Sequence, residues 1–194
     1  SITNADPQSP LPYFKGKAEV EQALIRSGIP YAIIRPAIIF GAEDILINNI
    51  AWLLRRFPVF VIPGKGDCLV QPVYADDLAF LAVAAAQGSG NPVIDAVGPE
   101  IYTFRELVRL IAHAIGSRAR LVHLPPSVAL LGSKLLGVIV KDVMLTRDEV
   151  DGLLSNLLVT SNPGTAPTKL SEWLRENASH VGVRYASELS RHYR

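Results

Sequence analysis

The stretch Tyr13-Phe14-Lys15-Gly16-Lys17 is where the sequence first indicates a chemical function. Side chains four residues apart lie over one another on a helix, so a helix here places the phenol of Tyr13 beside the ammonium group of Lys17. A nearby cation favours the phenolate form, lowers the pKa of a tyrosine and makes it a better proton donor and acceptor at neutral pH. The same spacing also fits a solvated lysine one turn away from a core tyrosine, so the pair needs its context.

The segments around this pair have the order of an α/β unit. We expect a helix over residues 12–27, because proline suits a helix start and Gly28 a helix end, with Glu21 among its solvent-facing residues. The run at 31–35 predicts a strand that is buried on both faces, as central parallel strands are, and Pro36 ends it.

The rest of the chain alternates predicted strands and helices. Two β-rich runs at 59–62 and 68–71 flank a glycine-containing turn and predict a β-hairpin. Thr103 and Glu106 have the spacing of a capping box, which begins a helix. Further strands are expected at 92–98 and 119–124, and further helices at 48–56, 78–86, 128–140, 146–154, 168–176 and 185–194.

Two of these helices bear on function. Asp76 and Asp77 precede the helix at 78–86, and we interpret them as residues that satisfy the free amides of its first turn rather than as catalytic carboxylates. The helix at 128–140 is very apolar, so it is expected to pack inside the protein or, alternatively, to lie against a membrane or a partner subunit.

Three segments together resemble the C-terminal half of an extended or atypical short-chain dehydrogenase/reductase, in the superfamily of NAD-dependent epimerases and dehydratases. They are the Tyr13-x-x-x-Lys17 pair, residues 35–41 (Arg-Pro-Ala-Ile-Ile-Phe-Gly) and residues 71–79 (Gln-Pro-Val-Tyr-Ala-Asp-Asp-Leu-Ala), which occur in the family's order. The sequence at residues 60–64 and 71–74 is most similar to the atypical branch that includes the nucleotide-binding accessory subunit of respiratory complex I.

This resemblance implies a fold and a reaction. The implied fold is α/β, with the C-terminal part of a Rossmann-like, doubly wound parallel sheet (residues 1–41 and 69–100) and a small, mainly helical lobe with a β-hairpin (residues 42–68 and 101–194). The implied reaction is hydride transfer with NAD or NADP, on a small-molecule substrate that no motif identifies.

The resemblance also assigns residues of an active site. Tyr13 is the expected acid/base, and Lys17 is expected to lower its pKa and to bind the cofactor ribose. Ser1 stands twelve residues before the tyrosine, where the family's catalytic serine polarises a substrate carbonyl; a serine without any role fits the position equally well. Pro36 and Ala37 follow the predicted strand and are expected to border the nicotinamide.

The sequence departs from the family in two respects. Gly64-Lys-Gly66 and Gly88-Ser-Gly90 both lack the third glycine of a dinucleotide-binding turn. We therefore expect a piece without the N-terminal cofactor-binding half, which by itself binds NAD(P) weakly or not at all. Gln71 stands where sugar-nucleotide epimerases usually carry an arginine, and a neutral amide does not form a charged clamp on a diphosphate.

The likeness to the complex I accessory subunit motivates an alternative function. In this alternative the protein is a catalytically silent nucleotide-binding scaffold or an assembly subunit, which keeps the fold but does not use the chemistry. The apolar helix at 128–140 and the basic end of the chain support the same interpretation.

Composition narrows the range of partners. The 19 basic and 18 acidic residues nearly cancel, which gives no electrostatic reason to expect nucleic acid. The single cysteine, Cys68, cannot form an internal disulfide and favours a reducing, cytoplasmic compartment. No apolar run is long enough to span a bilayer, so we expect at most peripheral membrane or complex association, and a homodimer is a further expectation. The histidines lack metal-ligand spacing, so no metal site is expected.

Overall fold

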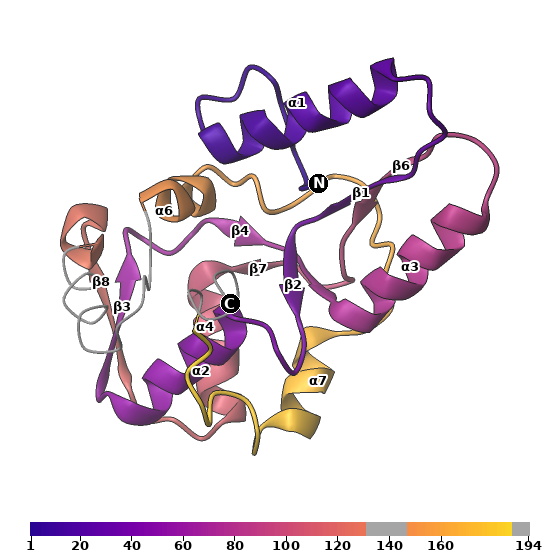
Figure 1. The fold of residues 1–194 in the computed structure, drawn as a ribbon. Helices are drawn as coiled ribbons and strands as arrows, with labels where there is room; N and C mark the ends of the chain where they lie inside the picture. Colours follow the sequence, from indigo (N-terminus) through magenta and orange to yellow (C-terminus); the bar gives the residue numbers. More distant parts are fainter. Residues whose placement is uncertain (131–146, 188–194) are drawn as a thin grey trace. The chain divides into compact units, whose positions relative to one another are not determined.

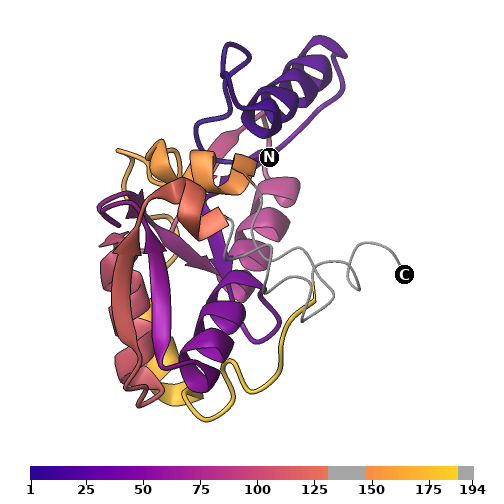
Figure 2. The same ribbon diagram turned by 90° about the vertical axis from the view of Figure 1, so that its left-hand side faces the viewer.

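The computed structural model describes residues 1–130 and 147–187 of the chain. Most of the predicted helices at 128–140 and 185–194 lies outside these described residues. The chain has an α/β fold, as predicted (Figures 1 and 2). It divides into two compact units. The first contains Ser1–Gly41, Leu69–Ile101 and Asp151–Leu170, and the second contains Ala42–Cys68, Tyr102–Val150 and Ser171–Arg194.

Parallel strands form the centre of the first unit. β1 (Ile33–Pro36) pairs with β6 (Val93–Ala96), and β2 (Ile38–Phe40) pairs with β5 (Pro72–Tyr74), both in parallel. Strands that run in parallel need a crossover, and the helix α3 (Ala75–Gln87) connects β5 to β6. The unit also contains α1 (Pro12–Arg26) and the short strand β4 (Leu69–Val70).

The first residues of the chain extend along β1 on the side away from β6. The N–H of Ile33 points to the β6 side, so the carbonyls of Ile34 and Pro36 point to the opposite edge. The backbone nitrogen of Ser1 donates to Ile34 and that of Thr3 donates to Pro36, each at 3.0 Å. Because both segments advance by two residues between these bonds, the start of the chain runs parallel to β1.

The second unit packs helices against another pair of parallel strands. β3 (Val59–Pro63) pairs with β8 (Arg120–Leu124), and α2 (Leu46–Arg56) contacts both β3 and α4 (Phe104–Ala114). The predicted capping box is confirmed: the Thr103 hydroxyl accepts from the Glu106 amide, and the Glu106 carboxylate accepts from the Thr103 amide. The strand β7 (Tyr102–Thr103) precedes α4, and the helices α6 (Arg147–Leu154) and α7 (Leu170–Asn177) follow later in the chain.

The predicted hairpin at 59–62 and 68–71 is wrong. β3 takes β8 as its parallel partner, in a register that runs from Val59 opposite Arg120 to Pro63 opposite Leu124. The N–H of Gly64 continues this ladder by donating to Leu124 at 2.8 Å, so the chain does not fold back onto β3 at the turn. Two β-rich runs around a glycine turn do not by themselves exclude a partner from a distant part of the sequence.

Two further expectations differ from the structure. Within β1 only Ile33 is buried, so this strand is not covered on both faces. Residues 151–170 belong to the first unit, whereas the expected division placed all of 101–194 in the smaller lobe. Backbone pairing accounts for the difference, because the amide of Gln71 donates to the carbonyl of Leu158 at 2.9 Å.

Candidate active site

The first turns of α1 present the predicted tyrosine and lysine side by side. Pro12 begins the helix and places Tyr13 in its first turn. The Nζ atom of Lys17 lies 5.3 Å from the centre of the Tyr13 ring, and Tyr13 is 54% exposed. The alternative interpretation of the pair was a solvated lysine beside a core tyrosine. Because more than half of Tyr13 is exposed, it is not a core residue, and this alternative does not hold for the tyrosine.

Both polar groups of this pair are available to a ligand. Within the described part of the chain, neither the Tyr13 hydroxyl nor the Lys17 ammonium forms a hydrogen bond or an ion pair. The position of the ammonium near the ring is one that the electron-rich face of an aromatic ring favours. A phenol and an ammonium with unused donors can form hydrogen bonds with the hydroxyl groups of a ligand.

The other predicted site residues lie along β1 or at its end. Pro36 is the last residue of β1, and Ala37 connects it to β2; both are half-buried. Ser1 is exposed beside β1, held by its backbone bond to Ile34. No hydrogen bond joins Ser1 to Tyr13 within the described residues, so the structure brings the tyrosine and lysine together without adding the serine.

A buried ion pair fastens α1 to β1. Arg35 donates from Nε and Nη2 to the two carboxylate oxygens of Glu21, at 2.9 and 2.5 Å, and the Glu21 side chain is only 7% exposed. Burial by itself would raise the pKa of the Glu21 carboxyl, but hydrogen bonds from Arg35 and Ser1 hold this pKa below its ordinary value. The hydrogen bond with Glu21 also raises the pKa of the Arg35 guanidinium.

The sequence-based prediction that Glu21 faces solvent is therefore wrong. The sequence spacing does indicate that Glu21 shares a helix face with the predicted pair. Tyr13, Lys17 and Glu21 stand four residues apart and form one row along α1. This row runs from the exposed phenol to the buried carboxylate, whose partner Arg35 directly precedes Pro36. The ion pair thus fixes the face of α1 that carries the phenol relative to β1.

A cavity of about 570 Å³ lies next to this ion pair in the first unit. Its wall includes Arg35, Leu11 directly before α1, and residues from two loops: Asn4, Ala5, Asp6, Ser9, Pro10, Ser155 and Leu157. The amide of Asn4 donates to the carbonyls of Leu157 and Val159 at 2.9 and 2.8 Å, and so ties the two loops together. Asn4 has a φ of 56°, a left-handed conformation that asparagine tolerates better than most residues. Neither Tyr13 nor Lys17 is among the residues that line this cavity.

Gln71 has a structural role in the same unit. This side chain is 3% exposed; its Nε2 donates to the carbonyl of Gly98 at 2.9 Å, and its Oε1 accepts from the amide of Thr160 at 3.3 Å. The residue that replaces the arginine of sugar-nucleotide epimerases therefore has internal partners for both ends of its amide. A ligand phosphate has no access to it.

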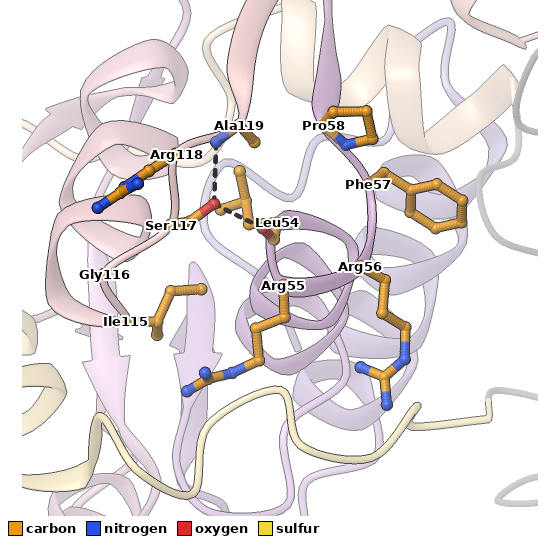
Figure 3. Close-up of a pocket in the computed structure, with 10 residues that line it drawn as sticks. All are labelled: Leu54, Arg55, Arg56, Phe57, Pro58, Ile115, Gly116, Ser117, Arg118 and Ala119. Atoms are coloured by element: carbon orange, nitrogen blue, oxygen red, sulfur yellow. Dashed lines mark hydrogen bonds between the residues drawn. The ribbon is translucent and has the colours of Figure 1, made fainter.

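A second cavity, of about 490 Å³, lies in the second unit at the ends of α2 and α4 (Figure 3). Three arginines line it, but Figure 3 shows that their side chains point in different directions. Arg55 donates to the carbonyls of Val181 and Ala178, and Arg56 donates to that of Val183. Two of these arginines thus fasten the segment around 178–183 to α2, which makes this cavity a weaker candidate for an anion site.

Across residues 1–130 and 147–187, no group of three or more His, Cys, Asp or Glu side chains is placed to hold a metal ion. In the same part of the chain, no helix combines the length and the apolar character needed to span a bilayer.

Comparison with known proteins adds sequence and fold relationships. No family model matches the sequence. Subunit 9 of the alpha subcomplex of mitochondrial NADH dehydrogenase (ubiquinone) from Arabidopsis thaliana is 27% identical over 173 residues, which are 84% of this chain and 43% of that protein. The 40 kDa subunit of mitochondrial NADH-ubiquinone oxidoreductase from Neurospora crassa is 29% identical, over 78% of this chain and 40% of its own length. An NADPH-dependent quinone oxidoreductase from Escherichia coli has a TM-score of 0.71 at 23% identity, over 93% of this chain and 63% of its own. The chain is thus similar in sequence to these two subunits and similar in fold to the quinone oxidoreductase.

The chain spans about two fifths of the length of these two curated proteins, 43% and 40%. The likeness to the quinone oxidoreductase, which was solved with NADPH, confirms the predicted Rossmann-like α/β class. The two curated relatives are named as mitochondrial proteins, so they give no support to the predicted cytoplasmic location.

Proposed function

We propose that the full-length protein transfers a hydride between a nicotinamide cofactor, NAD or NADP, and a small-molecule substrate. The observation that carries this proposal is the exposed phenol of Tyr13 with the Lys17 ammonium 5.3 Å from its ring. The fold likeness to a quinone oxidoreductase that binds NADPH supports it. In this proposal the present chain supplies the acid/base side of the site, and the glycine-rich turn for the pyrophosphate lies elsewhere in the full-length protein.

Tyr13 and Lys17 carry the proton chemistry. The nicotinamide, when bound, supplies or accepts the hydride. As a carbonyl is reduced, negative charge develops on its oxygen, and the Tyr13 hydroxyl donates a proton to that oxygen; in the reverse direction the phenolate removes the proton. The Lys17 ammonium donates to the ribose hydroxyls.

Other residues position this pair. The Glu21–Arg35 ion pair holds α1 against β1, which keeps the phenol in a constant place while protons move. Pro36 and Ala37, at the end of β1, are proposed to border the nicotinamide, because ligands of parallel sheets bind at the carboxyl ends of strands. Ser1 is proposed to donate a hydrogen bond to the substrate carbonyl.

Replacing Tyr13 by phenylalanine in the full-length protein tests the role of the phenol. Nicotinamide oxidation with a panel of quinone and carbonyl substrates should slow about a hundredfold or more, since acid/base groups contribute about 10²–10⁴ to a rate. Cofactor binding should remain largely intact. The Tyr31→Phe variant removes a hydroxyl from another tyrosine of the same unit and should keep full turnover. Unchanged turnover in the Tyr13→Phe variant contradicts the proposal.

A second candidate function is a catalytically silent, nucleotide-binding assembly subunit. The names of the curated relatives favour it, because both are subunits of a mitochondrial NADH-ubiquinone oxidoreductase. In that case the full-length protein should co-purify with a membrane complex and keep its cofactor bound without turnover. Turnover that depends on Tyr13 would decide against this candidate.

A further inference from the structure

The cavity of about 570 Å³ in the first unit is a candidate ligand site in its own right. Its volume is in the range of small-molecule sites in proteins. Its wall combines Arg35 of β1 with residues from the segment 4–11, which precedes α1, and with two residues that follow α6. Since neither residue of the Tyr13–Lys17 pair lines it, the cavity is separate from the candidate acid/base group.

Three residues of the wall offer oxygen acceptors that no donor uses within the described part of the chain. The carboxylate of Asp6 accepts from the amide of Gln8 through Oδ1, at 2.9 Å, and its Oδ2 is unused. The Asn4 side chain donates to two carbonyls through Nδ2, and its Oδ1 is unused as well. The Ser155 hydroxyl donates its hydrogen to the carbonyl of Asp151 at 2.6 Å, which leaves its oxygen lone pairs for another donor. Three acceptors match the three N–H groups of an ammonium ion.

Two further residues of the wall offer donors. Arg35 donates to Glu21 from Nε and Nη2, and its Nη1 has no partner among the described residues. The Ser9 hydroxyl accepts from the amide of Leu11 at 3.2 Å, so its hydrogen remains available to a ligand. A guanidinium nitrogen and a hydroxyl are donors that suit a carboxylate group.

The charges of the wall restrict the kind of ligand. A simple anion is repelled by Asp6 and by Glu21, which lies against Arg35. A simple cation leaves the donors of Arg35 and Ser9 without an acceptor. A molecule that carries both an ammonium and a carboxylate group uses the acceptors and the donors together. Apolar residues on the same wall suit a hydrocarbon side chain: Ala5, Pro10, Leu11 and Leu157.

We propose that this cavity binds a free α-amino acid with an aliphatic side chain. The ammonium group lies at Asp6, Asn4 and Ser155, and the carboxylate lies at Arg35 and Ser9. Because Arg35 also pairs with Glu21, a ligand that binds this arrangement stabilises the contact between β1 and α1. The inference goes beyond the proposed function and does not depend on it.

Isothermal titration calorimetry of the full-length protein tests the proposal, with L-leucine as the probe. Two analogues each lack one charged group: isopentylamine has no carboxylate, and 4-methylpentanoate has no ammonium group. We expect leucine to bind with a Kd of about 1 mM or tighter. Each analogue should bind at least about tenfold more weakly, because it loses one set of charged hydrogen bonds.

The Asp6→Asn variant locates the site. This change should weaken leucine binding at least about tenfold, because it removes the negative charge that pairs with the ammonium group. The Glu19→Gln variant is the matched control: it removes an exposed carboxylate of α1 that does not line the cavity, and it should bind leucine like the wild type. In hydrogen exchange with mass spectrometry, leucine should slow the exchange of residues 4–11 and of α1.

Three results would overturn the proposal. The first is the absence of leucine binding at a concentration of about 10 mM. The second is an equal affinity for leucine and for its two analogues. The third is leucine binding that the Asp6→Asn change does not weaken, since the ligand would then lie elsewhere.

These outcomes can be separated from a failure of the proposed function. A full-length protein that shows no nicotinamide turnover, but binds leucine in an Asp6-dependent way, contradicts the enzymatic role and supports the amino-acid site. A protein with Tyr13-dependent turnover that binds no leucine gives the opposite result. Reduction of the nicotinamide that requires leucine would make the cavity a substrate site and would overturn its separation from the Tyr13–Lys17 pair.

Discussion

The Glu21→Gln substitution gives the sharpest test of how the candidate site is held in place. The change keeps the shape of the side chain and removes the negative charge that pairs with Arg35. Breaking a buried ion pair by removing one partner costs about 3–5 kcal/mol. The Arg35 side chain is 28% exposed, so water offsets part of this loss, and the glutamine oxygen still accepts one hydrogen bond. We therefore expect α1 to lose about 1–3 kcal/mol of local stability.

The pH dependence of the wild-type protein follows from the same pair. The folded state lowers the pKa of Glu21, so the stabilisation is fully present above the ordinary glutamate pKa of about 4.3. It is lost as the pH falls through the lowered value of the folded state. Between neutral pH and this acidic range, the wild-type α1 should lose more protection than α1 of the Glu21→Gln variant.

Hydrogen exchange with mass spectrometry on α1 peptides of the full-length protein measures both effects. The Glu19→Gln variant is the matched control, because Glu19 is an exposed neighbour on the same helix without an ion pair among the described residues. Exchange of α1 that is no faster in Glu21→Gln than in Glu19→Gln at neutral pH would show that the ion pair does not stabilise α1.

Four other substitutions test the packing and capping of the fold by urea denaturation. Gly98→Ala should cost about 3 kcal/mol or more, because a Cβ atom at Gly98 would lie 2.1 Å from the carbonyl oxygen of Pro72. In contrast, a Cβ atom at Gly16 would meet no atom within 4 Å, so Gly16→Ala should stabilise α1 by about 0.5–1 kcal/mol. Equal effects of Gly98→Ala and Gly16→Ala on stability would contradict the close approach of residue 98 to Pro72. Gln71→Leu should cost about 1–3 kcal/mol, since it leaves buried backbone groups unpaired, and a neutral effect would show that the amide is not needed. Thr103→Ala should cost about 1 kcal/mol through loss of the capping box. An unchanged midpoint of urea denaturation would show that the capping box does not stabilise the protein.

The elements that the sequence predicts well are those fixed by neighbouring residues. The helix that carries Tyr13 and Lys17 begins at its proline and ends near its glycine, and their spacing already places both on one face. The start of α4 follows equally well from Thr103 and Glu106, because a capping box is complete within four residues.

The features that the sequence does not predict depend on distant segments. Glu21 is buried only because Arg35, on another element, approaches it. The partner of β3 lies some sixty residues later in the chain, and nothing in the local pattern at 59–63 identifies β8. Residues 151–170 join the first unit through backbone hydrogen bonds to strands about ninety residues earlier. Non-local pairing of this kind is not encoded in periodicity or turn composition.

The Tyr13–Lys17 pair is proposed to face a nicotinamide nucleotide, and a cofactor titration of the full-length protein tests this role most directly. NADH and NADPH are titrated against the wild type, the Lys17→Met variant and the Lys15→Met variant, whose lysine is exposed and lies two residues away on the same helix. A charged hydrogen bond contributes about 1.5–3 kcal/mol, so Lys17→Met should bind the preferred nucleotide at least about tenfold more weakly, while Lys15→Met should bind like the wild type. Equal affinities in all three proteins, or no binding by the wild type, would contradict the account.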